Sequence, residues 1–519
     1  MTASREARTS SSYAAEPADR QAPLEMPAEE FRAVAHALVD RIADFLGGLR
    51  ERPVMPPGAD AGAFRALIER TAGTGLPERG AEASRLVDEA ASIVLEHSTL
   101  IAHPRFFGYI VGSPSPIGVL GDLLAAAANQ NVGGWTLSPM ATEVERQTVR
   151  WLAELVGLPE GSGGLLVSGG NMANIVCTVA ARAAKAGWDV RERGMAAEGA
   201  ARLTMYASAE THTWVQKAAD LCGLGTEAIR WIPTDDALRM RVDLLRERVA
   251  DDLAAGRRPF MVVATAGSVS TGAIDPVSEI ADLCEAHDLW LHVDGAYGAP
   301  AAALPDAPAD LKAIARADSI AIDPHKWLYV PVEAGCALVR DPEALRRAFS
   351  YTPPYYHFAE VDAEPRVNFY EFGPQNSRAF RALKVWLTLR QAGREGITRM
   401  VADDIALGER MHEAAGRFPE LERGAHGLSI ATMRYVPPEL AGRADAAEYL
   451  DALNQAVLER IQAEGECFLS NAVLGGRFFL RGCIVNFRTT AKDVDAVPEI
   501  VVRVAREVDA EMRPAGLKG

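Results

Sequence analysis

The sequence predicts an α/β protein whose main domain is a mostly parallel β-sheet flanked by helices. Short β-rich runs alternate with helical stretches between about residues 116 and 341, and this alternation is typical of strand–helix–strand units. The runs at 289–293 and 319–322 are largely apolar, as expected of parallel strands buried on both faces. With 519 residues, the chain can bury a large core and form two or three domains.

The N-terminal part predicts a tail followed by a helical segment at 26–112. Residues 1–25 are rich in Ser, Ala, Glu and Arg, so we expect a disordered tail without the apolar core of a signal peptide. Residues 27–49 predict an amphipathic helix whose apolar stripe needs a partner surface, either in the same chain or on a second subunit. The stripe comprises Phe31, Val34, Leu38, Ile42 and Phe45.

The main domain, which we assign to residues 113–385, is expected to hold seven strands. They lie at 164–167, 202–207, 229–232, 259–265, 289–293, 319–322 and 336–339. The helical stretches between them predict crossover connections, so most of these strands should be parallel.

A small α+β domain is predicted at residues 386–519. Strands are expected at 478–480 and 483–487, and a closing helix from about Asp493. Before them, residues 377–415 predict a helix that is interrupted near its two glycines, Gly393 and Gly396.

Composition excludes several classes of protein. The chain has 54 basic and 70 acidic residues, a net charge of −16, which repels nucleic acid and anionic membranes. Its six cysteines are scattered without Cys-x-x-Cys spacing, which argues against a metal site or a disulfide framework. No apolar run approaches the roughly 20 residues that span a bilayer. We therefore expect a soluble, cytoplasmic protein without a metal, a nucleic-acid partner or a membrane span.

Two residues at predicted strand ends indicate the chemistry. Asp294 follows the run 289–293, and Lys326 follows 319–322 within Asp323-Pro324-His325-Lys326-Trp327. Both side chains should emerge at the carboxyl ends of parallel strands, where open α/β sheets bind ligands. Pyridoxal phosphate (PLP) requires a lysine that can form an imine and a carboxylate that can hold a protonated pyridine nitrogen. The pair therefore predicts a PLP enzyme.

These motifs resemble the PLP-dependent group II decarboxylases, the family of the aromatic-L-amino-acid, histidine and glutamate decarboxylases, whose hallmark is a His-Lys pair usually followed by Trp or Met. The resemblance runs from about residue 27 to about residue 505 and includes Ser138-Pro139 and Thr142-Glu143-Val144-Glu145. It implies a fold-type I PLP enzyme that decarboxylates an amino acid. It also implies a homodimer, because fold-type I sites are generally built at a subunit interface.

The resemblance assigns roles around the cofactor ring. Lys326 would hold PLP through an imine, with its pKa lowered by a partly desolvated pocket and a cationic neighbour. Asp294 would keep the pyridine nitrogen protonated, so that the ring acts as an electron sink. His212 would stack on one ring face and assist proton transfer, and Ala296 would pack on the other. His325 would touch the phosphate or the substrate, or only pack beside Lys326.

A phosphate cradle is expected where the first strand of the main domain meets a helix. The motif Ser168-Gly169-Gly170-Asn171 lets backbone amides approach a phosphate at a helix N-terminus. The resemblance selects Gly170 and Asn171 and adds Ser319. Asp323 stands where some relatives carry Asn near the phosphate, and Val269 stands where many carry Thr near the PLP hydroxyl. A carboxylate beside a dianion is repelled unless it is turned away or paired, so Asp323 is left out of the predicted contacts.

PLP itself does not choose the reaction, because any bond at the substrate Cα that stands perpendicular to the ring can break. In the resembled family a loop tyrosine usually delivers the proton after CO2 leaves. Tyr355 matches that position, with Tyr356 beside it. Relatives that form aldehydes with oxygen tend to carry Phe there, so a tyrosine favours simple decarboxylation.

The predicted substrate is an aromatic L-amino acid of the tryptophan, phenylalanine, tyrosine or DOPA class. Regions that line the family's side-chain pocket carry aromatic residues here, which suit an aromatic ligand but are equally typical of core packing. Arg105 keeps an acidic substrate open, because glutamate-type relatives share His-Pro-Arg-Phe-Phe. The aromatic residues are Phe106, Phe107, Tyr109 and Trp135.

Overall fold

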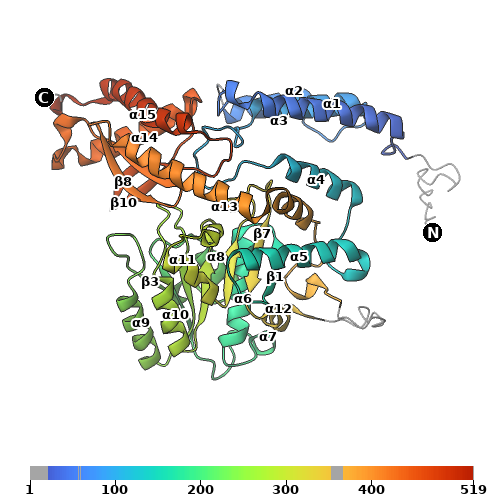
Figure 1. Ribbon diagram of the computed structural model, residues 1–519, viewed down its shortest axis with the longest axis vertical. Helices are drawn as coiled ribbons and strands as arrows, with labels where there is room; N and C mark the ends of the chain where they lie inside the picture. Colours follow the sequence, from blue (N-terminus) through green and yellow to red (C-terminus); the bar gives the residue numbers. More distant parts are fainter. Residues whose placement is uncertain (1–21, 57, 59, 352–365, 518–519) are drawn as a thin grey trace, which may run out of the picture. The chain divides into compact units, whose positions relative to one another are not determined.

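The computed structural model describes residues 22–56, 58, 60–351 and 366–517 (Figure 1). Its contacts divide the chain into two compact units. The first unit extends to Thr99, except for Pro53–Pro57, which belongs with Leu100–Gly519 in the second unit. The domain boundaries predicted after residues 112 and 385 fall inside the second unit and stay predictions.

The first unit is helical. Its helices are α1 (Ala28–Gly47), α2 (Ala61–Ala72) and α3 (Ala83–His97). α1 packs along α3, where Arg41 pairs with the carboxylate of Asp88 and donates to Ser92 Oγ at 2.9 Å. The helix predicted at 27–49 is thus present. No residue of α1 is buried within the chain, and Phe31 of the apolar stripe is 58% exposed.

The second unit is built on a seven-stranded sheet of order β1-β7-β6-β5-β4-β2-β3. Its strands are β1 (Gly163–Val167), β2 (Leu203–Ser208), β3 (Ile229–Ile232), β4 (Arg258–Thr265), β5 (Trp290–Asp294), β6 (Ser319–Ile322) and β7 (Gly335–Val339). β2 to β6 pair in parallel, whereas β7 is antiparallel to both β1 and β6. All seven predicted strands are present, with each end shifted by one residue at most, and the predicted fold class is confirmed.

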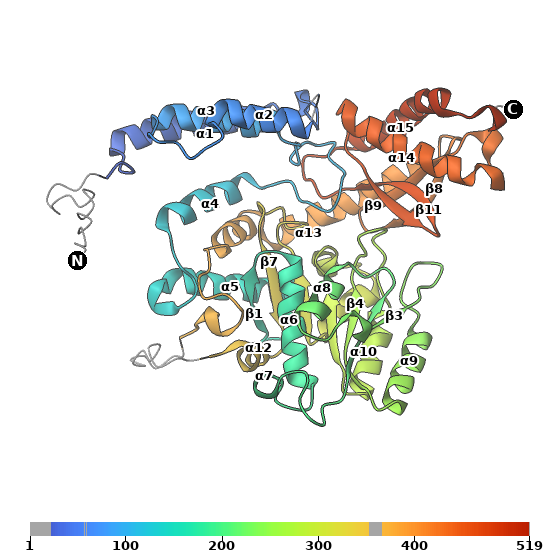
Figure 2. The same cartoon turned by 180° about the vertical axis from the view of Figure 1, so that it is seen from behind.

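Helices cover both faces of this sheet (Figures 1 and 2). The helices around it include α5 (Pro139–Leu155), α6 (Gly170–Lys185), α7 (Val190–Arg193), α8 (Trp214–Leu221), α9 (Val242–Ala254), α10 (Val277–Ala286), α11 (Ala309–Lys312) and α12 (Pro342–Phe349). The helix α4 (Pro116–Ala128) packs instead against the long helix α13 (Ala382–Ala415). Side chains alternate along β4, because successive residues of a strand point to opposite faces. Val262 and Ala264 join the core formed with α5, α9 and α10, whereas Met261 and Val263 join the core formed with α6 and α8.

A second, antiparallel sheet of order β10-β11-β9-β8 lies in the C-terminal part. Its strands are β8 (Leu421–Gly427), β9 (Ile430–Tyr435), β10 (Ser470–Leu474) and β11 (Arg477–Cys483), and its core is shared with α13 (Ala382–Ala415), α14 (Ala447–Glu464) and α15 (Ala491–Met512). The predicted interruption of the long helix is present, because Gly393 in α13 has φ 65° and ψ 171°.

One strand prediction in this part is wrong. The run 483–487 does not form a strand of its own, since β11 already ends at Cys483. Beyond that residue the chain leaves the sheet, and the carbonyl of Val485 accepts a hydrogen bond from Ser113 at 3.1 Å instead of from a neighbouring strand. A short apolar run therefore marked a buried connection and not a strand.

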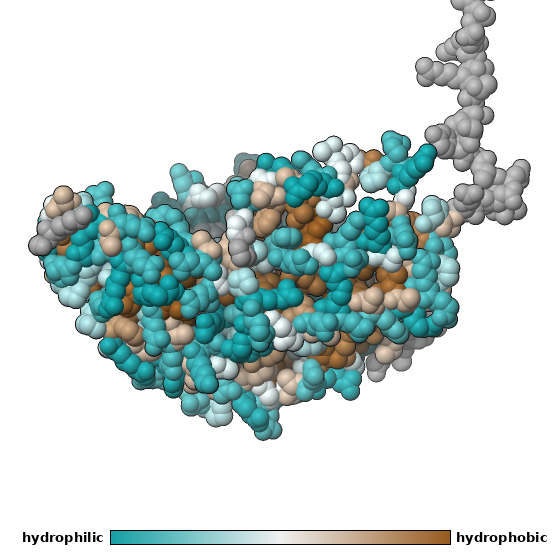
Figure 3. Space-filling view, turned by 90° about the horizontal axis from the view of Figure 1, so that it is seen from above, coloured by the Kyte–Doolittle hydropathy of each residue, from teal (hydrophilic) through white to brown (hydrophobic). Residues whose placement is uncertain are grey.

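The surface is mainly polar. Most of the face shown in Figure 3 is hydrophilic, and hydrophobic residues gather in separate patches. One exposed apolar row lies on α4, where Leu120, Leu123 and Leu124 are each more than half exposed within the single chain. None of the described helices is both long enough and apolar enough to cross a membrane.

Candidate active site

A cavity of about 530 Å³ lies at the carboxyl ends of the parallel strands. Thr265 and Asp294 end β4 and β5, and Asp323 directly follows β6, so three neighbouring strands deliver side chains to one place. Ligands bind at this edge of open α/β sheets, and the volume is usual for a small-molecule site. Seven predicted cofactor residues line it: Lys326, Asp294, His212, Gly170, Asn171, Ala296 and His325.

Lys326 is held in the cavity by an ion pair. Its Nζ lies 2.9 Å from Oδ2 of Asp323, and its side chain is 22% exposed. Burial alone would lower the pKa of Lys326, but the carboxylate of Asp323 outweighs it, and the net shift of the pKa is upward. Among the described residues, the immediate neighbour of Lys326 is therefore a carboxylate and not the cation expected to lower this pKa.

Asp294 is held by neutral donors. Its Oδ2 accepts a hydrogen bond from Trp214 Nε1 at 2.7 Å, and its Oδ1 accepts one from the backbone N–H of Ala296 at 3.2 Å. Asp294 is buried and lines the cavity. Because neither donor carries a charge, the carboxylate can still bind a cation that enters the cavity.

Two histidines near the site have different surroundings. His212 lines the cavity with an exposed side chain, and desolvation by the surrounding protein lowers its pKa although Asp294 acts in the opposite direction. His292 is completely buried in β5, and burial lowers its pKa to about 4. It lies outside the cavity lining, with Nε2 2.6 Å from Asn174 Oδ1 and Nδ1 2.8 Å from Ser319 Oγ. His292 is therefore a neutral packing residue behind the site.

The N-terminus of α6 forms a cradle suited to a phosphate. The turn before it needs glycine, because Gly169 has φ 113°. A Cβ on Gly170 would lie 2.6 Å from Asp323 Oδ2, so only glycine fits there. The first N–H groups of a helix have no intrahelical partners and attract anions. Gly170 and Asn171 present this end of α6 to the cavity.

Ser319 is not brought to the cavity. It is the first residue of β6 and so stands at the opposite edge of the sheet from Asp323. Its hydroxyl accepts a hydrogen bond from Trp290 Nε1 at 2.8 Å and contacts His292. This buried network already uses the hydroxyl, so the structure corrects the expectation that Ser319 contacts a phosphate.

The pyridoxal-dependent decarboxylase conserved domain matches residues 67–420. The chain belongs to this family. An aromatic-L-amino-acid decarboxylase of Bacillus atrophaeus is 33% identical over 93% of this chain and 97% of its own length. A histidine decarboxylase of Drosophila melanogaster is 34% identical over 90% of this chain and 54% of its own. The crystal structure of Oryza sativa TDC with PLP and tryptamine superposes with a TM-score of 0.85 and 28% identity, covering 94% of this chain and 99% of that one.

The protein is thus a pyridoxal-dependent decarboxylase, a carboxy-lyase whose cofactor is PLP. The cavity fits that group in its chemistry. Lys326 supplies an amine, Asp294 supplies a carboxylate without a cationic partner among the described residues, and the N-terminus of α6 supplies free N–H groups. These three features are those that PLP requires.

Of the aromatic residues predicted to line the substrate pocket of this decarboxylase, the structure brings one to the cavity. Tyr109 lines it and is 61% exposed. Phe106 stacks on Phe468, with ring centroids 5.1 Å apart, and Phe107 lies in the core of the C-terminal part. In this chain both are packing residues, because both rings are buried among other apolar side chains.

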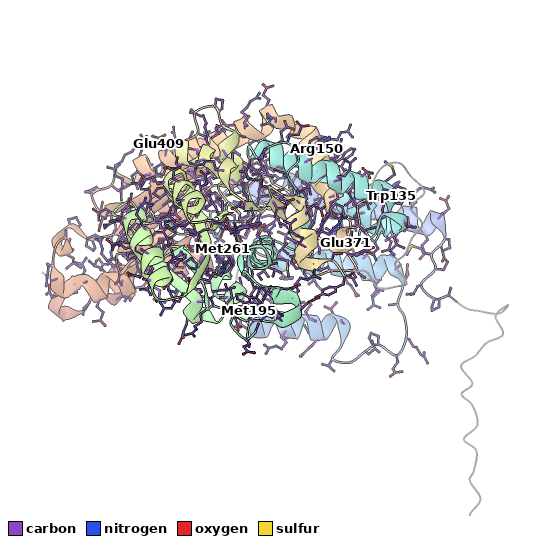
Figure 4. The ribbon with its side chains drawn as sticks, turned by 90° about the horizontal axis from the view of Figure 1, so that it is seen from below. Trp135, Arg150, Met195, Met261, Glu371 and Glu409 are labelled. Atoms are coloured by element: carbon purple, nitrogen blue, oxygen red, sulfur yellow. The ribbon has the colours of Figure 1, made fainter. Side chains whose placement is uncertain are left out.

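Trp135 also lies outside the cavity lining. It begins a short 3-10 helix, Trp135–Leu137, and its ring lies under the guanidinium of Arg366 at 4.4 Å. Figure 4 shows Trp135 toward the edge of the molecule, away from Met261 of the central strand β4. Trp135 therefore does not contribute to the pocket within a single chain. A larger cavity of about 1050 Å³ follows α5 and contains none of the predicted cofactor residues.

Arg481 is a site residue of the decarboxylase that the sequence did not single out. It lies on β11, lines the cavity and is 4% exposed. One Nη donates to the carbonyl of Val269, and no acidic side chain pairs with it among the described residues, where its Nε also has no partner. Burial lowers its pKa. The sequence places Arg481 directly after the strand predicted at 478–480, but only the fold brings this residue of β11 to the cavity.

The predicted proton donor, Tyr355, and its neighbour Tyr356 lie outside the described residues, in the segment 352–365. The chain on either side of this segment is described. Ser350 Oγ donates to Glu371 at 3.1 Å, and Arg346 of α12 also pairs with Glu371 at 3.1 Å. These contacts hold the two flanks of the segment together.

Proposed function

We propose that this decarboxylase converts an aromatic L-amino acid, of the tryptophan, phenylalanine, tyrosine or DOPA class, to the corresponding amine and CO2. Lys326 binds the cofactor aldehyde. The observation that carries the proposal is the cavity in which Lys326, Asp294 and the N-terminus of α6 meet. Asp294 ends strand β5, Lys326 follows strand β6, and Gly170 begins helix α6. Because these elements belong to one packed sheet, they hold the three features in a fixed geometry.

PLP, when bound, supplies an electron sink for the electron pair left at the substrate Cα when the carboxylate departs. The chain keeps that sink effective. Asp294 holds a proton on the ring nitrogen, and the N–H of Trp214 fixes the carboxylate in place through a buried hydrogen bond of 2.7 Å. A hydrogen bond to a charged group contributes about 1.5–3 kcal/mol, enough to set the orientation of Asp294.

The remaining cavity residues orient the ring and the phosphate. His212 would stack on one face of the ring, and its lowered pKa keeps the imidazole neutral near pH 7. The small side chain of Ala296 leaves room on the other face. The backbone N–H groups of Gly170 and Asn171 bind the phosphate at the N-terminus of α6. His325 lines the cavity, and its Nδ1 lies 2.7 Å from the carbonyl oxygen of Ala334.

Arg481 binds the α-carboxylate of the substrate, and Tyr355 delivers the proton that replaces it. A buried guanidinium without a carboxylate partner among the described residues favours an anion strongly. Tyr109 offers an aromatic surface for the substrate side chain. The aromatic-L-amino-acid decarboxylase of Bacillus atrophaeus and the structure with tryptamine support this substrate class.

A second candidate substrate class is acidic, because Arg481 would pair equally well with a side-chain carboxylate. Incubating the protein and PLP with an equimolar mixture of the standard amino acids and DOPA, followed by amine detection, separates the two classes. Aromatic amines are expected. Exclusive formation of γ-aminobutyrate or β-alanine would contradict the aromatic proposal, and a peroxide and ammonia assay on the same samples would reveal an aldehyde-forming reaction.

We also infer a homodimer in the cytoplasm. The exposed leucines of α4 and the open face of α1 support a second subunit, because apolar rows of this kind usually mark an interface. The six cysteines are all buried and unpaired, which supports a reducing compartment. Sizing the purified protein tests the dimer, and a mass of one chain would exclude it.

A further inference from the structure

Two aromatic residues anchor the turn that carries Lys326. This turn, residues 323–330, follows β6, and it is closed where the N–H of Tyr329 donates to the carbonyl oxygen of Lys326 at 3.2 Å. Lys326 lines the cavity, whereas the rings of Trp327 and Tyr329 are buried in a hydrophobic core. The backbone position of Lys326 therefore depends on how these two rings are held.

One oxygen atom holds both rings. Oδ2 of Asp404, on α13, accepts a hydrogen bond from Trp327 Nε1 at 2.9 Å and another from Tyr329 Oη at 2.7 Å. Because a buried donor without an acceptor is costly, these two bonds fix Trp327 and Tyr329 relative to α13. Asp404 itself is buried and lies outside the cavity lining. It can therefore act on Lys326 through these two residues without touching the cofactor.

Tyr329 needs this support because its backbone is strained. Its φ of 55° lies in the left-handed region, which is unfavourable for a bulky side chain. Such a conformation persists only where the surrounding contacts hold it. Besides the bond of the hydroxyl to Asp404, the carbonyl oxygen of Tyr329 accepts a hydrogen bond from the N–H of Ser115 at 2.7 Å. Without the bond to Asp404, we expect Tyr329 to relax and the turn to shift with it.

Trp327 has a second contact, with Tyr297. The two rings stack, with their centroids 4.7 Å apart and an angle of 20° between their planes. Tyr297 lines the cavity, and its hydroxyl accepts a hydrogen bond from the N–H of Ser429 at 3.0 Å. The indole of Trp327 is thus held by its face and by its N–H, which leaves the residue next to Lys326 a single orientation.

A lysine side chain cannot supply such precision itself. Its four-carbon stem is flexible, so the place of the amine depends on the backbone that carries it. Reacting atoms must come within about 3–3.5 Å of each other, and a displacement of about 1 Å can lower a rate about 10²-fold. The ion pair with Asp323 orients the amine locally, whereas the two aromatic anchors determine where the turn places it.

We propose that Asp404 is a positioning residue for Lys326. Its Oδ2 holds Trp327 and Tyr329, the turn 323–330 then keeps one conformation, and the lysine amine stays where it meets the cofactor aldehyde. This role needs an acceptor oxygen, because both hydrogen bonds end on a single oxygen. An amide, which keeps one oxygen, should therefore replace the carboxylate, whereas an apolar side chain should not. The inference rests on the proposed role of Lys326 as the residue that binds the cofactor.

The test compares two ligands on the cofactor-free protein. PLP forms a bond with the lysine, so its affinity depends on the place of the amine. Pyridoxine 5′-phosphate has the phosphate but no aldehyde, so its affinity does not. Asp404→Leu should weaken PLP binding by about 10- to 100-fold, the loss usual for a hydrogen bond to a charged group, and leave pyridoxine 5′-phosphate binding unchanged. Asp404→Asn should keep both affinities. Equilibrium dialysis measures them.

Asp509→Leu is the matched control. Asp509 is a buried aspartate of α15 outside the cavity lining, where it accepts a hydrogen bond from Tyr449 and pairs with Arg513. Its replacement should lower the stability of the fold without changing the ratio of the two affinities. Tyr329→Phe removes one of the two bonds to Asp404 and is the second variant, should Asp404→Leu fail to fold. It should weaken the binding of PLP alone, to a smaller extent.

Equal weakening of the two ligands, or an unchanged affinity for PLP in Asp404→Leu or Tyr329→Phe, would overturn the positioning role. A loss of PLP affinity in Asp509→Leu that matches the loss in Asp404→Leu would also overturn it, because the effect would then be general. Borohydride reduction and peptide mass analysis of the wild type identify the lysine that is attached. Attachment at a different lysine would instead overturn the proposed function.

Discussion

Asp294 and Asp323 stand at the carboxyl ends of neighbouring strands and line the same cavity, yet they keep different partners. Asp294 accepts hydrogen bonds from two neutral donors, Trp214 and the backbone of Ala296. Asp323 is neutralised by the ammonium group of Lys326. The first carboxylate is therefore available to a cation that enters the cavity, and the second is not. Two buried residues of the same type thus have different roles, because the partner decides whether the negative charge is still available.

Replacing Lys326 should have the largest effect, because it removes the cofactor amine and the partner of Asp323 together. Lys326→Ala should lose the bound yellow chromophore and lower kcat by about a thousandfold or more. Steady-state amine formation with saturating PLP measures the loss. Lys312→Ala, which changes an exposed lysine outside the cavity, is the matched control and should keep full activity. Normal turnover by Lys326→Ala would remove the basis for the contrast between the two aspartates.

Asp294→Asn should have the next largest effect, because an amide cannot hold a proton on the pyridine nitrogen. We expect kcat to fall by about 10²- to 10⁴-fold, the usual range for a proton-holding group.

Trp214→Phe removes the neutral donor to Asp294 and should lower kcat about tenfold, equal to roughly 1.4 kcal/mol. Equal losses in the two variants would mean that the orientation of Asp294, and not its charge, is what matters.

Much of this contrast could be predicted from the sequence. Asp294 and Lys326 follow apolar runs that became β5 and β6, since strand periodicity and strand ends are local properties of the chain. The partners could not be predicted. Trp214 reaches Asp294 from α8, 80 residues away in the chain, and Arg481 reaches the cavity from another sheet. Such contacts depend on tertiary packing, which residue spacing does not encode.

The aromatic residues illustrate the same limit. Aromatic residues such as Phe106, Phe107 and Trp135 are common in ligand pockets, but an aromatic ring packs equally well in a core. Phe106 meets Phe468, more than 300 residues later in the chain, and is buried by it. The expectation for Ser319 has a related limit, because the position of a residue along a strand decides at which edge of the sheet it lies. Ser319 begins β6 and so lies at the edge opposite the cavity.

Arg481 is the complement of Asp294, a buried cation that lacks a carboxylate partner among the described residues. Arg481→Leu should raise KM by about 10- to 100-fold, because a hydrogen bond to a charged group contributes about 1.5–3 kcal/mol. Initial rates over a range of substrate concentrations measure this change. Arg477→Leu, on the same strand but outside the cavity lining, should leave KM unchanged. A fall in kcat with constant KM would argue against carboxylate binding by Arg481.

A third buried aspartate lies outside the cavity lining and has no cationic partner among the described residues. Asp404 of α13 accepts hydrogen bonds from Trp327 Nε1 at 2.9 Å and Tyr329 Oη at 2.7 Å. Burial raises its pKa to about 7, although these donors oppose the shift. Because the folded pKa lies above that of the unfolded chain, Asp404 stabilises the fold below about pH 4, and this contribution is lost as the pH rises through about 7.

Asp404→Asn should therefore have the smallest effect on activity and a clear effect on the pH dependence of stability. The amide imitates the protonated acid. Between about pH 4 and 7, the free energy of unfolding of the wild type should fall relative to the variant by up to about 1.4 kcal/mol per pH unit. Denaturant unfolding at several pH values measures the difference. A constant difference would show that Asp404 does not titrate in this range.

The central claim, that Lys326 is the residue bound to the cofactor, is tested most directly by chemical reduction of the holoenzyme. Borohydride fixes the lysine–cofactor bond, and mass analysis of the digested protein then identifies the modified residue. We predict a single pyridoxyl-modified peptide that contains Asp323-Pro324-His325-Lys326-Trp327, with the added mass on Lys326. Modification of a different lysine, or no modification of a yellow, active protein, would contradict it.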